Sequence, residues 1–372
     1  MNSRNFYDGF IYDWWKNLDK VVFFLILSLV ILGIFFSLVS TSLIASSKFG
    51  TNNYYFFLRH FTYVFLGLTL IVIFSAIREE DIYKIAIILF IIFFISLLLI
   101  PFIGVEVKGS KRWLNLAILP RFQPVEFLKP FLVVFLSLVI GSRFTSNNNF
   151  KFLLSILIVT PVLLLLVLQP DIGQTLLISS VWLSLVFVSG INLYFLCVLL
   201  ILSISIVGYM VLYLPKFAYI KSRVTSFFDV TSKGNYQSQK ANDAIVDGGF
   251  FGKGIGEGTL NTRVPEAHTD YVISVIAEEF GVLLILLILL IFLLLIFRVF
   301  KKIPLEKNNC NKLILIGSIL LIIFQVLIHI GVNIRLLPTT GMTLPFLSYG
   351  GSSILSSSIL AGLILNFTKR RI

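Results

Sequence analysis

The sequence predicts an all-α polytopic membrane protein: a bundle of about ten transmembrane helices with a large extracytoplasmic loop between spans 7 and 8. Of its 372 residues, 58% are hydrophobic and only 13% are charged, whereas soluble domains average roughly 25% charged residues. Apolar runs of roughly 17 residues or more recur along the chain, and each can cross a hydrocarbon core about 30 Å thick. We expect helices because each backbone N–H and C=O in lipid needs a partner within its own span.

The expected spans form one membrane domain over residues 21–367. Residues 1–20 are expected at the cytoplasmic interface, residues 215–271 in the large extracytoplasmic loop, and residues 368–372 in a basic cytoplasmic tail. The first apolar run is too long for the core of a cleavable signal peptide. The spans are residues 21–40, 61–77, 82–103, 125–140, 152–168, 172–188, 191–214, 272–300, 313–332 and 344–367.

Charge predicts the orientation of the bundle. An even number of spans places both termini on one side, and Lys and Arg then divide equally between the two sides. The positive-inside rule weights short loops, so the cations of the long loop count less, and both termini are expected in the cytoplasm. The formal net charge of +12 is spread over many loops, which indicates contact with anionic lipid and no nucleic acid. The two cysteines have no paired spacing, which predicts neither a disulfide framework nor a metal site.

The first motif is cationic and covers residues 108–130, KGSKRWLNLAILPRFQPVEFLKP. Single lysines near a membrane commonly snorkel and anchor a loop, but so many cations on an outer face favour an anionic ligand. Glu126 and Lys129 are three residues apart on one helical face, so a local ion pair and a direct function both remain open. The candidate anion-binding residues are Lys108, Lys111, Arg112, Arg121 and Lys129.

Two further motifs have mainly structural interpretations. In QPDIGQT, residues 169–175, Asp171 is placed to cap the following helix, which we favour over catalysis. The glycine-rich stretch GGFFGKGIGEG, residues 248–258, follows no strand, so it does not indicate dinucleotide binding. It predicts tight turns at the membrane surface.

The stretch RVPEAHTDYVISVIAEEFG, residues 263–281, concentrates ionisable groups beside the eighth span. Asp270 suits a general base acting on a hydroxyl, with Glu266 and His268 as companions. The alternative is that Thr269 or Asp270 merely caps the helix. Glu278 and Glu279 lie about 12 Å further along the helix, so they are expected to hydrogen-bond to neighbouring spans.

The last motif, residues 331–353, interrupts an apolar region with prolines and glycines. Such breaks persist in a membrane only where they are buried in protein or line a cavity. In the span before it, Gln325 and His329 are expected to hydrogen-bond to other helices.

In chain order, KGSKRWL, FQPVEFLK, QPDIGQT, NYQSQKA, PEAHTDYVISVIAEEFG and LPFLSYGGSS resemble signatures of the SEDS family, which includes RodA, FtsW and SpoVE. The resemblance is closest to the FtsW branch. It implies a peptidoglycan glycosyltransferase of the bacterial inner membrane that polymerises lipid II into β-1,4-linked glycan on the outer face, at the division septum. Undecaprenyl pyrophosphate would be released.

The resemblance also implies roles for residues and partners. Asp270 matches the essential aspartate of the family, and Arg121 and Lys129 match its functional basic positions. Lys111 and Arg112 join them as candidate pyrophosphate ligands, with Gln123, Glu126, Glu266 and His268 in support. A divalent cation, Mg²⁺ or Mn²⁺, is compatible with this chemistry although no ligand set stands out, and no organic cofactor is expected. Val125 departs from the usual serine of the family, which affects positioning at the start of the fourth span.

Expected partners are lipid II, the nascent glycan strand, a class B penicillin-binding protein transpeptidase and other division proteins. Two other functions are open: a lipid II flippase, and a non-catalytic scaffold that recruits the transpeptidase. A flippase should carry functional charges through the midplane of the bundle, whereas the clusters here fall at one face.

Overall fold

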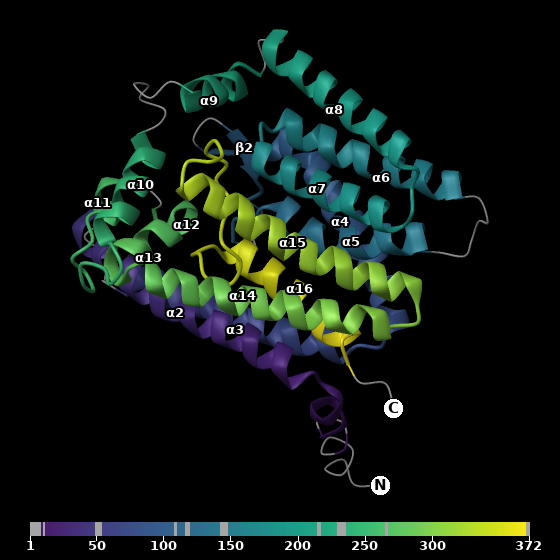
Figure 1. Cartoon of the computed structure of the whole chain (residues 1–372), viewed down its shortest axis with the longest axis horizontal. Helices are drawn as coiled ribbons and strands as arrows, with labels where there is room; N and C mark the ends of the chain where they lie inside the picture. The colour runs from purple at the N-terminus through teal and green to yellow at the C-terminus, as the bar shows by residue number, and fades with distance from the viewer. Residues whose placement is uncertain are drawn as a thin grey trace.

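The computed structural model is a helical bundle (Figure 1). It describes residues 9, 12–48, 54–107, 110–115, 120–141, 148–213, 217–228, 236–264 and 267–369. Within them, seven helices contain a stretch long and apolar enough to cross a membrane. These are α2 (Lys20–Lys48), α3 (Tyr55–Ala76), α4 (Glu79–Ile103), α5 (Pro124–Gly141), α6 (Asn148–Leu168), α14 (Val282–Lys302) and α15 (Asn309–Asn333).

Three further apolar helices are shorter or less continuous: α7 (Ile172–Val188), α8 (Leu193–Tyr213) and α16 (Gly351–Phe367). The predicted class, a helical multi-span membrane protein, is therefore confirmed, while the count of ten spans stays a prediction. One small departure from an all-α fold follows α4, where β1 (Val105–Val107) and β2 (Ser110–Trp113) form an antiparallel hairpin.

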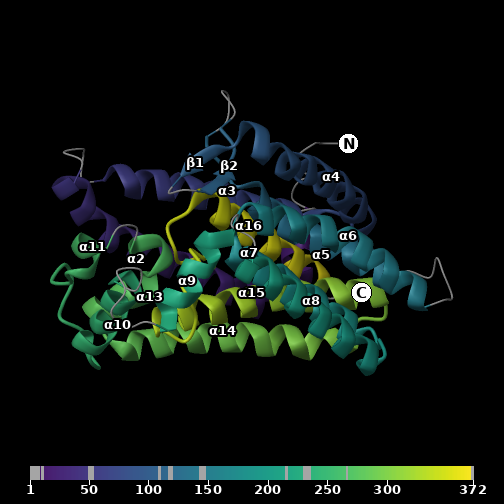
Figure 2. The same ribbon diagram turned by 90° about the horizontal axis from the view of Figure 1, so that it is seen from above.

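The centre of the bundle consists of α5, α15 and α16. Most residues of α5 and α15 are buried, and α16 is buried along almost its whole length. Figure 2 shows α5 and α16 between α4 on one side and α14 on the other. The segment 334–350, which joins α15 to α16, is not helical, yet Leu344, Phe346 and Ser348 within it are buried. The half of this segment that leads into α16 is therefore buried in protein, which is one of the two expected settings for such a break, whereas Leu336 in the first half is 70% exposed.

The continuous eighth span predicted over residues 272–300 is wrong. The structure has α13 (Val272–Phe280) and α14, separated at Gly281, whose φ is 84°. A side chain at Gly281 would place its Cβ 2.2 Å from the carbonyl oxygen of Phe250. Only glycine combines this backbone conformation with such a close approach.

The glycine turn, residues 248–258, supplies the hydrogen bonds that the break removes. The N–H groups of Lys253 and Gly254 donate to the carbonyls of Glu278 and Glu279, at 2.8 and 3.1 Å. In return, the N–H of Val282 donates to the carbonyl of Gly249 at 3.0 Å. The predicted tight turns are confirmed, with positive φ at Gly249, Gly252, Gly254 and Gly256. Backbone groups freed by a break must find partners, and this turn provides them.

In the described part of the long segment before α13, the chain forms four short helices. They are α9 (Ala218–Phe228), α10 (Tyr236–Gly248), α11 (Leu260–Arg263) and α12 (Ala267–Asp270). Figure 1 shows α10, α11 and α12 at the end of the bundle away from the C-terminus. At the opposite end, buried Asp19 pairs with Arg298 at 2.9 Å and with Lys302 at 3.1 Å, joining the start of α2 to the end of α14.

Candidate active site

Asp270 is the last residue of α12. The N-cap of α13 is Tyr271, whose side chain makes no capping hydrogen bond. The alternative in which Thr269 or Asp270 is the N-cap residue of that helix is therefore wrong. The carboxylate of Asp270 lies beside Gly341, where a Cβ would be 3.7 Å from Oδ2.

The broken segment 334–350 and α12 form one hydrogen-bonded unit. The Ser348 hydroxyl donates to the carbonyl of Thr269 at 2.7 Å, and the N–H of Leu344 donates to that hydroxyl at 2.8 Å. The N–H of Tyr349 donates to the carbonyl of His268 at 3.3 Å. The backbone just before Asp270 is thus held by the broken segment.

Asn333, at the end of α15, joins this unit to the core. Its amide donates to the carbonyls of Asp270 at 3.3 Å and His329 at 2.8 Å. Its oxygen accepts from the N–H and hydroxyl of Ser274. We did not predict Asn333; the available signal was a polar residue at the last turn of an apolar span.

Gln325 and His329 hydrogen-bond to the broken segment, so the prediction that they join other helices is wrong. Gln325 donates to the carbonyl of Thr343 at 2.9 Å. His329 Nδ1 is 2.7 Å from the carbonyl oxygen of Met342. A non-helical segment has free backbone carbonyls, which are stronger acceptors than anything a neighbouring apolar helix offers.

His268 belongs to an aromatic group beside α12. Its ring is 5.4 Å from Tyr349 and 6.4 Å from Phe56, measured between ring centroids. His60 stacks on the other side of Tyr349 at 5.6 Å. His268 is therefore close to Asp270 in the chain and packed against α3, while Glu266 lies outside the described residues.

Arg223 of α9 is a cation at this site that sequence reasoning missed. Its guanidinium Nη1 donates to the carbonyl of Thr339 at 2.9 Å, two residues before Gly341. Burial raises the pKa of Tyr271, the Asp270 charge raises it further, and the charge of Arg223 opposes both. Arg223 and Asp270 are therefore both close enough to Tyr271 to influence its pKa.

The cationic motif forms a second group, at the start of α5. Lys129 Nζ is 3.0 Å from Glu126 Oε2, and both side chains are almost fully buried. Glu126 Oε1 accepts from the amide of Gln174. The local ion pair predicted for Glu126 and Lys129 is confirmed, and it lies inside the bundle.

Arg112 is also committed to protein contacts. It is 3.7 Å from Asp171 and donates to the carbonyls of Gln169 and Pro170. Asp171 accepts from the N–H of Gln174, which confirms its predicted role as cap of α7, and from Gln123 at 3.2 Å. Burial raises the pKa of Asp171, and the positive charge of Arg112 opposes that shift.

Lys111 and Arg121 are exposed, whereas Lys108 lies outside the described residues. The N-terminal part of α16 connects the two groups. Ser352 accepts from the N–H of Gln123 at 3.1 Å, Ser356 donates to the carbonyl of Glu126 at 2.6 Å, and Ser353 is 2.6 Å from the Thr343 hydroxyl. The start of α16 therefore contacts both the broken segment beside Asp270 and the cationic group at the start of α5.

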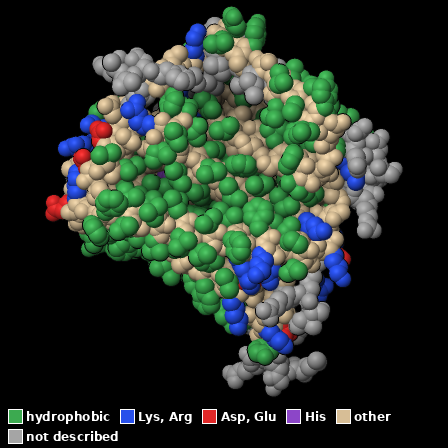
Figure 3. Space-filling view, viewed as in Figure 1, with side chains coloured by type: hydrophobic (Ala, Val, Ile, Leu, Met, Phe, Trp, Pro, Cys, Tyr) green, Lys and Arg blue, Asp and Glu red, His purple; other side chains and the backbone are tan. Residues whose placement is uncertain are grey.

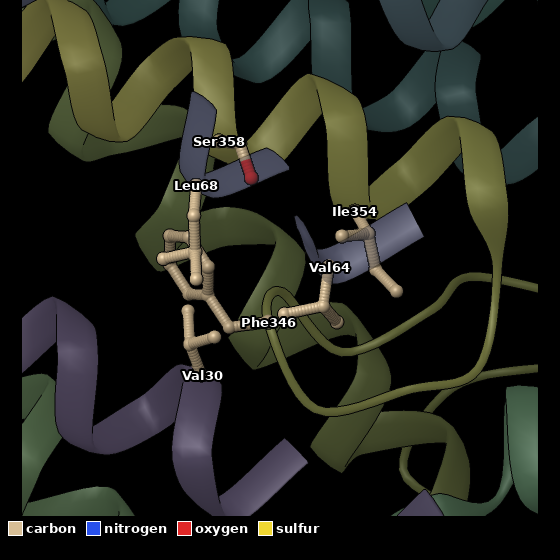
Figure 4. Close-up of a pocket in the computed structure, with 6 residues that line it drawn as sticks. All are labelled: Val30, Val64, Leu68, Phe346, Ile354 and Ser358. Carbon is tan, nitrogen blue, oxygen red and sulfur yellow. The ribbon is translucent and has the colours of Figure 1, made fainter. Parts of the chain in front are cut away.

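Apolar side chains of α2, α3 and α16 meet beside the broken segment and leave no room for a water molecule between them (Figure 4). Phe346 of the broken segment is one of the residues that meet here, and none of them is ionisable. Among the described residues, no group of three or more His, Cys, Asp or Glu side chains could hold a metal ion. The divalent cation that is compatible with this chemistry stays a prediction.

The acidic pair after Asp270 does not bond to neighbouring spans, contrary to prediction. Glu278 accepts from the N–H and hydroxyl of Thr259 at 2.9 and 3.1 Å and from the N–H of Leu260 at 2.9 Å. Lys253 lies 3.6 Å from the same carboxylate. Glu278 therefore holds the start of α11, from which the chain leads directly to α12.

Glu279 predicts a pH-dependent stability. Burial raises the pKa of its carboxyl from 4.5 to about 7; the nearby backbone of Gly256 opposes the shift and the charge of Glu278 adds to it. The folded state therefore binds this proton more tightly than the unfolded state. Its stabilising contribution, roughly 3 kcal/mol at most, is complete below about pH 4.5 and is lost as the pH rises through about 7. We expect the Tm of the wild type to fall across this window.

Glu279→Gln is expected to remove that part of the pH dependence and to unfold at a higher temperature than the wild type at pH 8. Thermal unfolding in detergent at several pH values measures both effects. Asp247→Asn is the matched control, because Asp247 is an exposed carboxylate on the same segment. Parallel curves for Glu279→Gln and the wild type would mean that Glu279 is charged in the folded protein.

Comparison with known proteins gives the family of the chain. The family model described as "Cell cycle protein", for FtsW, RodA and SpoVE, matches residues 19–371. The chain belongs to the FtsW/RodA/SpoVE family. A probable peptidoglycan glycosyltransferase FtsW of Caulobacter vibrioides is 30% identical over 96% of this chain and 91% of its own length. One from Coxiella burnetii is 34% identical over 91% of this chain and 93% of its own.

Solved structures of FtsW/RodA/SpoVE proteins share the fold. One similar chain comes from a structure described as "Structural coordination of polymerization and crosslinking by a peptidoglycan synthase complex". Its TM-score is 0.77 and its identity is 27%, and the match covers 94% of this chain and 97% of that chain. The rod shape determining protein RodA of Thermus thermophilus has a TM-score of 0.69 and 26% identity, covering 94% and 96%. The predicted family resemblance is confirmed, whereas the roles of individual site residues stay predictions.

Proposed function

We propose that this FtsW/RodA/SpoVE family member is a peptidoglycan glycosyltransferase that polymerises lipid II, with Asp270 as the general base. The observation that carries the proposal is the position of Asp270, which is held by α15 and the broken segment beside Gly341. Glycine at this point means that residue 341 places no side chain against Oδ2. The names of the relatives, peptidoglycan glycosyltransferase FtsW, support the reaction class and a role in division.

In the proposed reaction, the Asp270 carboxylate takes the proton of the acceptor 4-hydroxyl as its oxygen attacks the anomeric carbon of the donor. The β-1,4 bond forms with inversion, and the bond to the pyrophosphate of the polyprenyl carrier breaks. This is the logic by which a carboxylate activates water in inverting glycosidases. Cationic side chains stabilise the negative charge that develops on the pyrophosphate.

The cations divide into two classes. Arg112 and Lys129 are already paired with Asp171 and Glu126, so we propose that they support the site from within the bundle. Lys111 and Arg121 are exposed and are available to contact a phosphate. Arg223, which holds the segment facing Asp270, is a further candidate for electrostatic stabilisation.

We place both termini in the cytoplasm and the Asp270 face outside the membrane. The basic end of α14 supports this orientation through the positive-inside rule, because Arg298, Lys301 and Lys302 lie at the end away from α12. The similarity to a peptidoglycan synthase complex supports a transpeptidase partner, which we propose is a class B penicillin-binding protein. Lipid II and the growing glycan strand would meet at the outer face.

The reaction can be separated from lipid transport in one experiment. Purified protein with its transpeptidase partner is reconstituted into vesicles that contain labelled lipid II, and both glycan formation and movement of label across the bilayer are measured. Glycan formation without transport is the expected result. Transport without glycan formation would support the flippase, and neither activity would favour the scaffold.

Arg121→Gln and Arg223→Gln are each expected to lower the rate of glycan formation by about 10- to 100-fold, the size of one or two charge-assisted contacts to phosphate. Insertion and Tm should stay close to those of the wild type. Arg263→Gln is the matched control, because Arg263 is an exposed arginine of α11. Unchanged turnover in Arg121→Gln would assign that residue to anchoring of the loop.

A further inference from the structure

The glycine turn exposes large hydrophobic side chains on the outer end of the bundle. Phe250 is 72% exposed and Phe251 is 84% exposed, and Val246 and Ile255 beside them are similarly exposed. Transfer of such exposed apolar surface from water into a hydrocarbon environment is favourable. We propose that this turn is a membrane anchor whose Phe250 and Phe251 insert into the outer leaflet.

The position of the turn along α14 places these side chains at the edge of the hydrocarbon core. α14 has 21 residues and is therefore about 31 Å long, which matches the thickness of the core. Its basic end carries Lys302, which pairs with Asp19. Its other end begins at Val282, and the N–H of Leu283 points to the carbonyl of Phe250 at 3.4 Å. Phe250 thus lies level with the first turn of the span.

The exposed apolar surface of α14 continues into the turn. Leu283, Leu286 and Leu287 are about half exposed, as expected of a helix that faces lipid. Figure 3 shows a broad hydrophobic band across this face, with charged side chains gathered at its left edge and lower right. Next to the two phenylalanines, Lys253 and Asp247 form a partly exposed ion pair at 3.1 Å. Apolar side chains that continue a lipid-facing helix surface, with charged side chains next to them, are typical of a segment at the membrane interface.

The anchor would set the height of the Asp270 segment above the membrane. The same turn binds the carbonyls of Glu278 and Glu279, and the Glu278 carboxylate holds Thr259 and Leu260 at the start of α11. A hydrogen-bonded path therefore leads from the two phenylalanines to the start of α11, which precedes α12 in the chain. A lipid surface fits this position better than a protein partner, because the turn shares the level and the apolar character of α14.

Depth-dependent fluorescence quenching tests the anchor without any assay of activity. In a Cys197→Ser/Cys310→Ser background, Phe251→Cys is labelled with an environment-sensitive dye, and the protein is reconstituted alone into vesicles of phosphatidylcholine and phosphatidylglycerol. Glu257→Cys, at an exposed polar position of the same turn, is the matched control. Equal Tm values for both variants and the wild type establish that the fold is retained.

We expect nitroxide-labelled lipid to quench the dye at position 251 several-fold more than the dye at position 257, with the reverse order for aqueous iodide. Equal iodide quenching at both positions would overturn the anchor. The anchor would also be overturned if nitroxide-labelled lipid quenched the dye at position 251 only weakly and the dye became protected from iodide only when the transpeptidase was added. That result would assign the turn to a protein interface. Loss of glycan formation in an independent assay would leave this result unaffected.

Discussion

Asp270→Asn lowers the rate of glycan formation by about 10²- to 10⁴-fold, the range that general base catalysis contributes. Asparagine has nearly the same shape but cannot accept the proton of the acceptor hydroxyl. We expect the fold to survive, because the carbonyl of residue 270 accepts from Asn333 and the carbonyl of Thr269 accepts from Ser348, and the substitution leaves both backbone contacts in place. Initial rates with purified protein and partner measure the effect, and thermal unfolding checks the fold.

Lys129→Met destabilises the protein by about 3–5 kcal/mol, because it leaves the Glu126 carboxylate buried without its counter-charge. Lys129 Nζ is 3.0 Å from Glu126 Oε2, and both side chains are almost fully buried. Removing both charges in Glu126→Gln/Lys129→Met should recover most of the loss, since no isolated charge is left. Denaturant unfolding in mixed micelles measures these changes.

Lys301→Met is the matched control for that comparison, because this lysine lies at the basic end of α14 outside the bundle core. Its free energy of unfolding should differ from the wild type by less than about 0.5 kcal/mol. A double variant that is no more stable than Lys129→Met would contradict the account and would mean that Lys129 has other essential contacts.

The membrane class and the approximate spans could be predicted because they depend on the local density of apolar residues. The site motifs could be found because ionisable residues are rare in such a chain. The cap at Asp171 was predictable for the same local reason, since its partner, Gln174, lies three residues along the chain.

Contacts between distant segments could not be predicted in this way. Arg223 reaches the broken segment from α9, and its sequence neighbourhood carries no sign of it. Asn333 stands out as a polar residue at the end of an apolar span, but its partner in α12 is visible only in the fold. Arg112 was identified as a cation, but its partner Asp171 is visible only in the fold.

The break at Gly281 shows a second limit of sequence reasoning. Apart from Glu278, Glu279 and Arg298, residues 272–300 are almost all apolar, which predicts one helix. The break exists because the glycine turn, far away in the chain, supplies partners for the backbone groups on both sides of it. A hydropathy pattern contains no information about those partners.

The most direct test of the central claim compares glycan formation from lipid II by the wild type, Asp270→Asn and Asp247→Asn, each purified with the transpeptidase partner and shown to unfold at the same temperature. Asp247 is an exposed carboxylate of the preceding segment and has no role in the proposed reaction. We predict that Asp270→Asn alone loses activity. Glycan formation by folded Asp270→Asn at the wild-type rate would contradict the assignment of Asp270 as the base.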